Sequence, residues 1–325
     1  MSLYKVFITR PLPPAALERI ATRCEITMNP EDIRLPPAQV AAACRDVEGL
    51  VVSATPVPAE LLEQAPRLRV VSTVGVGYDA IDVAACTRRG ILVTNTPHEV
   101  TEATADLSFA LLMAVARRVV EADRFVREGH WKFWTYGCMW GTDLMGKTLG
   151  VLGFGRIGQA VARRASGFSM RILYYSVDRP TPEREKELGA QFVDRETLLR
   201  EADFLSVHVP LAPDTHHLIA APQLALMKPT AFLINTSRGK VVEEAALVEA
   251  LQSKKIAGAA LDVFEFEPQI HPALLAMPNV VVSPHMGTAT RETRLAMAMG
   301  AVENMIAALA GERPPNLVNP EVWPK

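Results

Sequence analysis

Short runs of β-branched and apolar residues alternate with helix-like stretches along almost the whole chain. This alternation is typical of βαβ units, in which parallel strands form a sheet and helices cover its faces. The runs form two series, the first at residues 5–9, 25–28, 49–54, 69–74 and 91–95, the second at 148–153, 170–176, 202–210, 230–237, 258–264 and 279–285. Each series is long enough for its own sheet, so the sequence predicts an α/β protein with five strands in one domain and six in another.

Composition narrows the class of protein. The length of 325 residues suits two domains, and 49% hydrophobic with 22% charged residues is typical of a folded globular chain. The net charge of -2 offers no basic surface for nucleic acid or anionic lipid, so neither is expected as a partner. The apolar run 109–116 is far shorter than the roughly 20 residues of a membrane span. The N-terminus lacks the apolar region of a signal peptide, so we expect a cytoplasmic protein.

The four cysteines, Cys24, Cys44, Cys86 and Cys138, are far apart in the sequence and form no CxxC pair. This spacing argues against a disulfide framework or a zinc site. We therefore expect buried, reduced thiols and no bound metal.

Two helical segments suggest how the domains connect. A long helical pattern begins near Thr96–Thr101, where residues 96–99 fit a capping box and Thr101 is the alternative start. A last helical pattern follows His285 and ends at Gly311. We expect this last helix to return the chain to the first domain. The predicted domains are therefore residues 1–100 plus 290–325, and residues 101–289.

Residues 153–158 match the pattern GxGxxG. The motif follows an apolar strand and opens a helical stretch, which is the context that dinucleotide binding requires. Gly153 would permit the tight turn, Gly155 would let the backbone approach a pyrophosphate, and Gly158 would let the helix pack against the strand. Phosphates would then lie at the helix N-terminus, where N–H groups are free. The alternative is a glycine-rich turn without a ligand.

The end of the next strand bears on the choice of cofactor. About 20 residues after the motif, an acidic residue would hold the ribose 2′-hydroxyl of NAD. Ser176 stands at that strand end and is followed by Val177, Asp178 and Arg179. A small hydroxyl with Arg179 nearby favours NADP, whereas Asp178 keeps NAD open.

Reactive side chains follow three of the later strands. Arg238 follows the strand at 230–237, Glu265 and Glu267 follow the strand at 258–264, and His285 ends the strand at 279–285. Ligands of open α/β sheets bind beyond the carboxyl ends of the strands, so we expect these groups to converge there. The alternatives are a surface ion pair for Arg238 and solvated loop residues for the two glutamates.

These three residue types suit hydride transfer to a 2-oxo acid. A histidine can donate a proton to the carbonyl oxygen as hydride arrives at the carbon. A neighbouring carboxylate favours the imidazolium form and orients the ring. An arginine binds the substrate carboxylate through two parallel hydrogen bonds.

Together these motifs resemble the D-isomer-specific 2-hydroxyacid dehydrogenase family along nearly the whole chain. The matching segments are residues 72–82, 101–114, 146–165, 235–251, 259–268 and 283–294. Within the family the sequence looks most similar to glyoxylate/hydroxypyruvate and 2-ketogluconate reductases. The resemblance implies two Rossmann-like domains, a flavodoxin-like substrate (catalytic) domain and a dinucleotide-binding domain, in a homodimer.

The resemblance also implies residue roles. Arg238 would bind the substrate, Glu267 would pair with the catalytic histidine, and His285 would be the acid/base. The backbone at Val76 and Gly77 would hold the substrate carboxylate. Further cofactor contacts would be Thr104, Arg156, Ile157, Ser176, Val209, Pro210, Thr215, Thr236, Asp262 and Gly287.

Three of the four tryptophans lie in an irregular segment, residues 129–142. An aromatic cluster of this kind is either a satellite core or a subunit contact. In the subgroup that the sequence resembles, one of Trp131, Trp134 or Trp140 would reach the partner's active site.

The sequence therefore predicts an NAD(P)-dependent, reversible reductase of a small 2-oxo acid. Glyoxylate, hydroxypyruvate and 2-ketogluconate remain open, because discrimination by one methylene is worth only about 1–3 kcal/mol. The enzymatic alternatives are D-3-phosphoglycerate and D-lactate dehydrogenase. The alternative from another class is a dinucleotide-sensing, corepressor-like binding protein, which the short Pro-rich tail does not favour.

Overall fold

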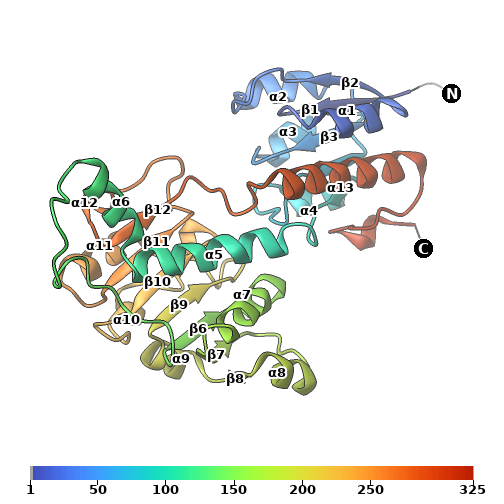
Figure 1. Ribbon diagram of the computed structural model, residues 1–325. Helices are drawn as coiled ribbons and strands as arrows, with labels where there is room; N and C mark the ends of the chain where they lie inside the picture. The colour runs from blue at the N-terminus through green and yellow to red at the C-terminus, as the bar shows by residue number, and fades with distance from the viewer. Residues whose placement is uncertain (1–2, 325) are drawn as a thin grey trace. The chain divides into compact units, whose positions relative to one another are not determined.

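The computed structural model describes residues 3–324 (Figure 1). The chain divides into two compact units, one made of Met1–Val100 with Thr288–Lys325 and the other of Thr101–Gly287. The first unit is thus discontinuous in sequence. The boundary predicted from the sequence, between residues 289 and 290, lies two positions further along the chain.

The first unit contains a five-stranded parallel sheet in the order β2-β1-β3-β4-β5. This is the flavodoxin-like order. Its strands are β1 Tyr4–Ile8, β2 Cys24–Met28, β3 Gly49–Val52, β4 Val70–Thr73 and β5 Leu92–Thr94. Its helices are α1 Pro14–Ala21, α2 Pro37–Ala43, α3 Ala59–Glu63, α4 Val83–Arg88 and α13 Arg291–Ala310, with a short 3₁₀ helix at Pro320–Val322. Every residue of β3 and β4 is buried, as expected for central strands covered on both faces.

The last helix, α13, belongs to this first unit. The Thr290 hydroxyl caps its N-terminus by accepting from Thr293 N–H, and Gly311 ends it in the left-handed conformation with φ of 79°. The predicted end of the helix at Gly311 is therefore confirmed. The helix packs against α1 and β4, and Val302 and Met305 enter the same apolar core as the β1 side chains.

The second unit contains a seven-stranded parallel sheet in the order β12-β11-β10-β9-β6-β7-β8. Its strands are β6 Thr148–Leu152, β7 Arg171–Tyr175, β8 Ala190–Phe192, β9 Phe204–Val207, β10 Phe232–Asn235, β11 Gly258–Leu261 and β12 Val280–Val282. The order reverses between β6 and β9, which makes this the switch point where such sheets bind ligands. The predicted fold class, two Rossmann-like parallel sheets, is confirmed. The prediction of six strands in the second series is wrong, because the edge strand β8 has the polar Gln191 at its centre and so shows no continuous apolar run.

The helices of the second unit cover both faces of its sheet (Figure 1). They are α5 Thr101–Ala116, α6 Val119–Arg127, α7 Arg156–Ser166, α8 Pro182–Leu188, α9 Arg195–Glu201, α10 Ala221–Leu224, α11 Glu244–Gln252 and α12 Pro272–Ala276, with a 3₁₀ turn at Gly239–Val241. The long helix α5 packs on β10, β11 and β12 beside α7.

The predicted capping box at residues 96–99 is wrong, since α5 begins at Thr101. Thr96 N–H is bonded to the Gly75 carbonyl, and the buried Thr96 hydroxyl has no hydrogen-bond partner, so it caps nothing. The helical pattern is also interrupted at Arg118, whose left-handed backbone separates α5 from α6.

The described cysteines are free thiols, three buried and one, Cys138, exposed. The expectation of buried thiols is therefore wrong for Cys138, which lies in the irregular aromatic segment. Burial raises the pKa of Cys44 and of Cys86 to about 12, which makes these two thiols poor nucleophiles. Within residues 3–324 no helix has the length and apolarity of a membrane span, and no three His, Cys, Asp or Glu side chains form a metal-binding group.

Candidate active site

The glycine-rich turn links β6 to α7. Gly153 has a φ of 92°, and its N–H donates to the Tyr175 carbonyl at the end of β7. A Cβ on Gly153 would lie 2.7 Å from the His208 backbone, and one on Gly158 would lie 2.2 Å from the Gly153 carbonyl oxygen. A Cβ on Gly155 would meet nothing within 4 Å. Gly153 and Gly158 are thus required by packing, whereas Gly155 leaves open space at the N-terminus of α7, where an anionic pyrophosphate would fit.

Two of the predicted catalytic side chains lie in contact. Nδ1 of His285 is 2.8 Å from Oε2 of Glu267, and Oε1 of Glu267 accepts a hydrogen bond from Phe264 N–H at 3.0 Å. Burial pushes the pKa of Glu267 upward, but these hydrogen bonds and the positive charges of His285 and Arg238 outweigh it and lower the pKa. Glu267 therefore remains a carboxylate at neutral pH, and it engages only one nitrogen of the imidazole.

Asp262, which directly follows β11, holds the loop that carries His285. Its Oδ1 accepts from the Ser283 hydroxyl at 2.6 Å and from Met286 N–H at 2.8 Å, and its Oδ2 accepts from Gly287 N–H at 2.8 Å. Its own carbonyl accepts from His285 N–H. His285 has a φ of 53°, which costs energy in a residue with a side chain. Asp262 thus offsets the strain of the loop, a role that differs from the cofactor contact predicted for it from the sequence.

Arg238 is placed beside Glu267 by a close backbone contact. A Cβ on the next residue, Gly239, would lie 1.9 Å from the Phe264 carbonyl, so the loops after β10 and β11 pack backbone to backbone. Arg238 donates from Nη1 to the Ser237 carbonyl at 2.8 Å, and its charge lowers the pKa of Glu267. Gly239 was not among the residues predicted from the sequence, although its position directly after Arg238 at a strand end was a usable signal.

The other candidate carboxylate, Glu265, has different partners. Its Oε1 lies 2.7 Å from Nε2 of His217, and its Oε2 accepts from Glu244 N–H at 3.0 Å. Glu265 therefore ties together the loops around α11, and Glu267 is the carboxylate next to His285.

Several predicted cofactor residues gather around the carboxyl ends of the strands. A Cβ on Gly287 would lie 3.5 Å from the Thr104 side chain of α5. The Thr236 and Ser108 hydroxyls are 2.6 Å apart, which joins the loop after β10 to α5. The Thr215 hydroxyl donates to the Pro210 carbonyl, and this hydrogen bond within the loop after β9 fixes that loop beside the switch point. The remaining predicted positions lie at the N-terminus of α7 (Arg156, Ile157), after β7 (Ser176) and after β9 (Val209).

The predicted substrate cradle belongs to the first unit. Val76 and Gly77 follow β4, and the Val76 carbonyl accepts a hydrogen bond from the Asn95 side chain at 2.9 Å. This bond holds the cradle loop against the segment that follows β5.

The cation expected near the ribose, Arg179, is already paired. Its Nη2 lies 2.8 Å from Oε1 of Glu185, and its guanidinium carbon is 4.3 Å from the centre of the Phe192 ring. Arg179 therefore does not offer an uncompensated charge to a 2′-phosphate.

His208, behind the glycine turn, makes stability depend on pH. Its Nε2 is 2.7 Å from the Ser206 hydroxyl, and burial lowers its pKa from 6.5 to about 4. As pH falls, the imidazole of His208 is protonated in the unfolded chain before it is protonated in the folded one. The stability that neutral His208 contributes is therefore complete above pH 6.5 and is lost as pH falls toward 4.

We expect the melting temperature of His208→Gln to fall less than that of wild type between about pH 7 and about pH 4.5. Parallel curves in a thermal-unfolding series would contradict this assignment.

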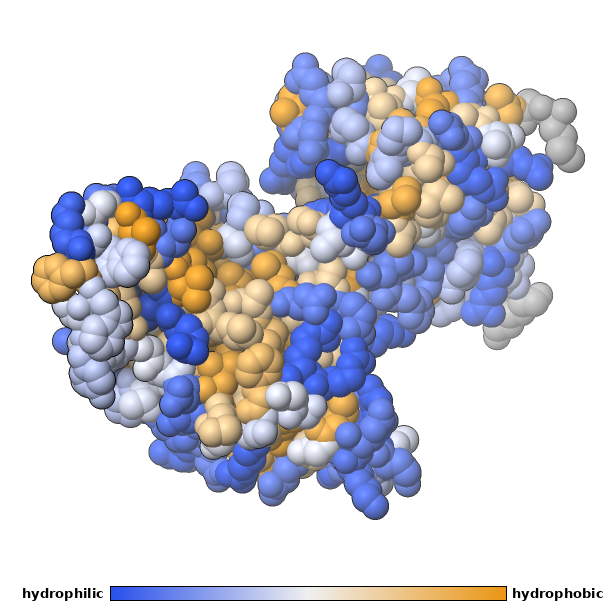
Figure 2. Space-filling model, viewed as in Figure 1, coloured by the Kyte–Doolittle hydropathy of each residue, from blue (hydrophilic) through white to orange (hydrophobic). Residues whose placement is uncertain are grey.

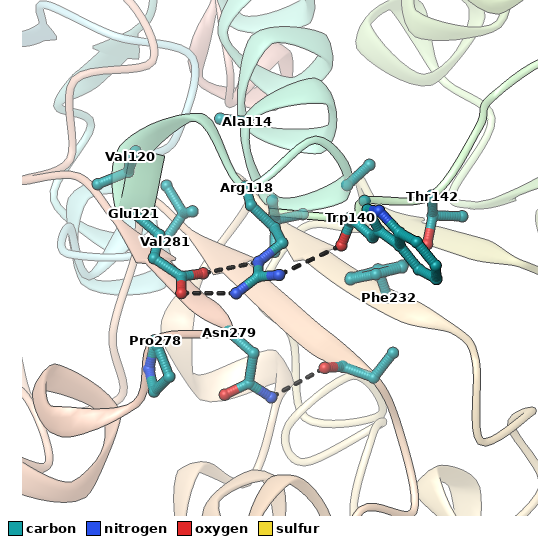
Figure 3. Close-up of a pocket in the computed structure, with 14 residues that line it drawn as sticks. Ala114, Arg118, Val120, Glu121, Trp140, Thr142, Phe232, Pro278, Asn279 and Val281 are labelled. Carbon is teal, nitrogen blue, oxygen red and sulfur yellow. Dashed lines mark hydrogen bonds and ion pairs between the residues drawn. The ribbon is translucent and has the colours of Figure 1, made fainter. Parts of the chain in front are cut away.

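A separate cavity of ≈ 300 Å³ lies at the end of α5 (Figure 3). It is lined by the ends of α5 and α6, by Trp140 and by residues of β10 and β12, and none of the predicted catalytic or cofactor residues lines it. Arg118 crosses it, paired with both oxygens of Glu121 at 2.7 and 2.8 Å and bonded to the Trp140 carbonyl (Figure 3). This cavity is therefore distinct from the candidate active site.

A sheet of this topology with an open helix N-terminus at its switch point is typical of a dinucleotide-binding protein. A histidine–carboxylate pair beside an arginine adds acid–base chemistry at the same edge of the sheet. These features define the class of dinucleotide-dependent oxidoreductases.

Comparison with known proteins agrees with this class. The family model described as D-isomer specific 2-hydroxyacid dehydrogenase, NAD binding domain, matches residues 109–287. Over 98% of its length, the chain is 53% identical to a glyoxylate reductase from Thermococcus litoralis, of which it covers 97%. A second glyoxylate reductase, from Korarchaeum cryptofilum, is also 53% identical over 98% of this chain and 96% of its own length. A solved NADPH-dependent glyoxylate/hydroxypyruvate reductase from Sinorhizobium meliloti, in complex with NADP and malonate, matches with a TM-score of 0.90 at 35% identity, covering 100% of this chain and 99% of that chain.

The chain belongs to the D-isomer specific 2-hydroxyacid dehydrogenase family. The family resemblance predicted from the sequence is confirmed, and so is the prediction of an oxidoreductase that acts on 2-oxo and 2-hydroxy acids. Its cofactor is a nicotinamide dinucleotide.

Proposed function

We propose that this enzyme reduces glyoxylate or hydroxypyruvate to the corresponding 2-hydroxy acid. The observation that carries the proposal is the pair of His285 and Glu267, 2.8 Å apart, with Arg238 beside them at the ends of adjacent strands. The names of the full-length relatives, glyoxylate reductases at 53% identity, support this substrate class.

The proposed roles follow from the contacts of each side chain. When bound, the dinucleotide supplies the hydride that the carbonyl carbon receives. His285 donates a proton to the carbonyl oxygen from Nε2, because its Nδ1 is engaged by Glu267. Glu267 orients the ring and stabilises its protonated form. Arg238 binds the substrate carboxylate.

In this proposal one unit binds the substrate and the other binds the dinucleotide. The unit of residues 1–100 with the C-terminal helix acts as the substrate domain, in which Val76 and Gly77 present backbone groups to the carboxylate. The unit from Thr101 holds the dinucleotide through the turn at 153–158, with Thr104, Thr236 and Gly287 near the nicotinamide end. The open space at Gly155 supports this assignment. We place the enzyme in the cytoplasm, which suits its free thiols.

We also propose that NADP(H) is the preferred cofactor and that NAD(H) is usable. Ser176 at the end of β7 supports a site that accepts a 2′-phosphate, and the NADP complex of the Sinorhizobium meliloti relative agrees with it. The pairing of Arg179 with Glu185 argues for a modest preference.

A substrate panel tests the proposal. The purified enzyme is given glyoxylate, hydroxypyruvate, 2-ketogluconate, 3-phosphohydroxypyruvate or pyruvate with NADPH or NADH, and dinucleotide oxidation is followed by absorbance. We expect the highest kcat/KM with glyoxylate or hydroxypyruvate. A higher value with pyruvate or 3-phosphohydroxypyruvate would instead identify a lactate or phosphoglycerate dehydrogenase.

A second copy of the chain is the proposed partner. Hydrophobic side chains gather on one face of the second unit around α5 (Figure 2), and α6 buries none of its residues, leaving Val119, Val120 and Val126 exposed. Trp131, Trp134 and Trp140 are exposed too, so the satellite-core interpretation of this segment is wrong. Exposed apolar surface of this kind marks subunit contacts.

Light scattering tests the proposed dimer. The wild-type protein should have twice the chain mass of 35.5 kDa, and the Val120→Glu variant should have the mass of a monomer. A monomeric wild type would refute the dimer.

A further inference from the structure

The ribose end of the proposed dinucleotide site contains a balanced pair of charges. Arg179 follows β7 by four residues and pairs with Glu185 of α8 through a 2.8 Å contact. The Arg179 side chain is 53% exposed, whereas that of Glu185 is only 18% exposed. A ligand can therefore reach the guanidinium from solvent, but the carboxylate beneath it compensates its charge.

Glu185 is held firmly in this position. The oxygen that faces Arg179 also accepts a hydrogen bond from the Tyr174 hydroxyl. The buried Tyr174 ring stacks on Phe154, with ring centres 4.0 Å apart, and Phe154 lies between Gly153 and Gly155 in the phosphate turn. Glu185 is thus connected through packed side chains to the turn that would bind the pyrophosphate.

A second contact fixes α8 against the same turn. Nε of Arg184, the neighbour of Glu185, donates to the Gln159 side chain at 3.0 Å, and that side chain donates to the Phe154 carbonyl at 3.0 Å. Hydrogen bonds from Tyr174 and Arg179 lower the pKa of Glu185, so it is charged at neutral pH. Glu185 is therefore a fixed negative charge beside the residue expected to bind a 2′-phosphate.

This charge affects the two cofactors differently. The 2′-phosphate of NADP carries a charge of about −1.5 to −2 near pH 7, as phosphate monoesters do, and an arginine would bind it through charge-assisted hydrogen bonds. Here the phosphate competes with Glu185 for Arg179 and is repelled by it. The 2′-hydroxyl of NAD is neutral and escapes this repulsion.

We propose that Glu185 is a specificity-determining residue that limits the preference for NADP(H) over NAD(H) by occupying Arg179. The inference rests on the proposed function, because it assigns the ribose of the dinucleotide to the end of β7.

Calorimetric binding of nucleotide fragments tests the proposal independently of catalysis. The probes are 2′,5′-ADP, which has the 2′-phosphate, and 5′-AMP, which lacks it. Glu185→Gln removes the charge but keeps an oxygen that can accept from Tyr174. We expect 2′,5′-ADP to bind about tenfold more tightly to this variant, a change of about 1.4 kcal/mol, with 5′-AMP unchanged. The ratio of kcat/KM for NADPH to that for NADH should rise by a similar factor.

Two further variants make the test specific. Glu183→Gln removes the same charge from the same helix and should leave both affinities at the wild-type values. Adding Arg179→Ala to Glu185→Gln should abolish the gain in 2′,5′-ADP affinity, because that gain depends on an Arg179 that no longer pairs with residue 185. Unchanged 2′,5′-ADP binding in Glu185→Gln, or an equal gain in Glu183→Gln, would overturn the proposal. If wild type binds neither fragment, the dinucleotide site itself is misplaced, and the proposed function fails with it.

Discussion

Replacing His285 with glutamine is expected to lower kcat for glyoxylate reduction by about 10²–10⁴-fold, the contribution typical of a general acid. Glutamine retains a group that can bond to Glu267, but it cannot donate a proton at neutral pH. Dinucleotide affinity should change much less than kcat, because the phosphate turn lies on a different loop. Steady-state oxidation of NADPH measures kcat, and calorimetry measures dinucleotide affinity.

The control is His98→Gln, which alters an exposed histidine of the first unit. This variant should keep the wild-type kcat. Glu267→Gln should fall between His285→Gln and wild type, since it leaves the imidazole in place but removes the charge that orients it and stabilises its protonated form. A wild-type kcat for His285→Gln would remove this residue from the acid–base role.

Replacing Gly239 with alanine is expected to damage both the fold and the site. The new Cβ would lie 1.9 Å from the Phe264 carbonyl, and backbone atoms cannot rotate away as a flexible side chain can. Overpacking of this kind costs about 1–3 kcal/mol, occasionally more. Each kcal/mol should lower the melting temperature by about 2–4 °C for a unit of this size. Because the loops after β10 and β11 must separate, Arg238 and Glu267 move apart, and kcat/KM should fall as well.

Gly155→Ala is the matched control for this variant. Its Cβ meets nothing within 4 Å, so the melting temperature should fall less than that of Gly239→Ala. Dinucleotide binding should nevertheless weaken, because the methyl group would fill the space into which a pyrophosphate would fit. An unchanged melting temperature for Gly239→Ala would contradict the backbone contact, and unchanged binding for Gly155→Ala would contradict the pyrophosphate position.

The local sequence pattern predicts most of the two sheets because their strands are buried on both faces. Such strands appear as continuous apolar runs, as β3 and β4 do. The edge strand β8 was missed because the polar Gln191 stands at its centre, whereas the equally short edge strands β5 and β12 are rich in β-branched residues. The capping box at residues 96–99 failed because backbone bonds to distant loops outcompete a local cap, as the bond from Thr96 to Gly75 illustrates.

The sequence by itself determined the parallel α/β architecture, the glycine turn and the three strand ends where reactive groups stand. These depend on residues that are neighbours along the chain, so their spacing carries the information. The local pattern left Glu265 and Glu267 equivalent and the family resemblance pointed to Glu267 as the partner of His285, but only the tertiary structure decided that Glu265 pairs with His217. The tertiary structure also decided that Glu185 forms an ion pair with Arg179. The physical reason is that hydrogen bonds and ion pairs form between loops brought together by the sheet, and two carboxylates two residues apart look alike until that sheet has formed.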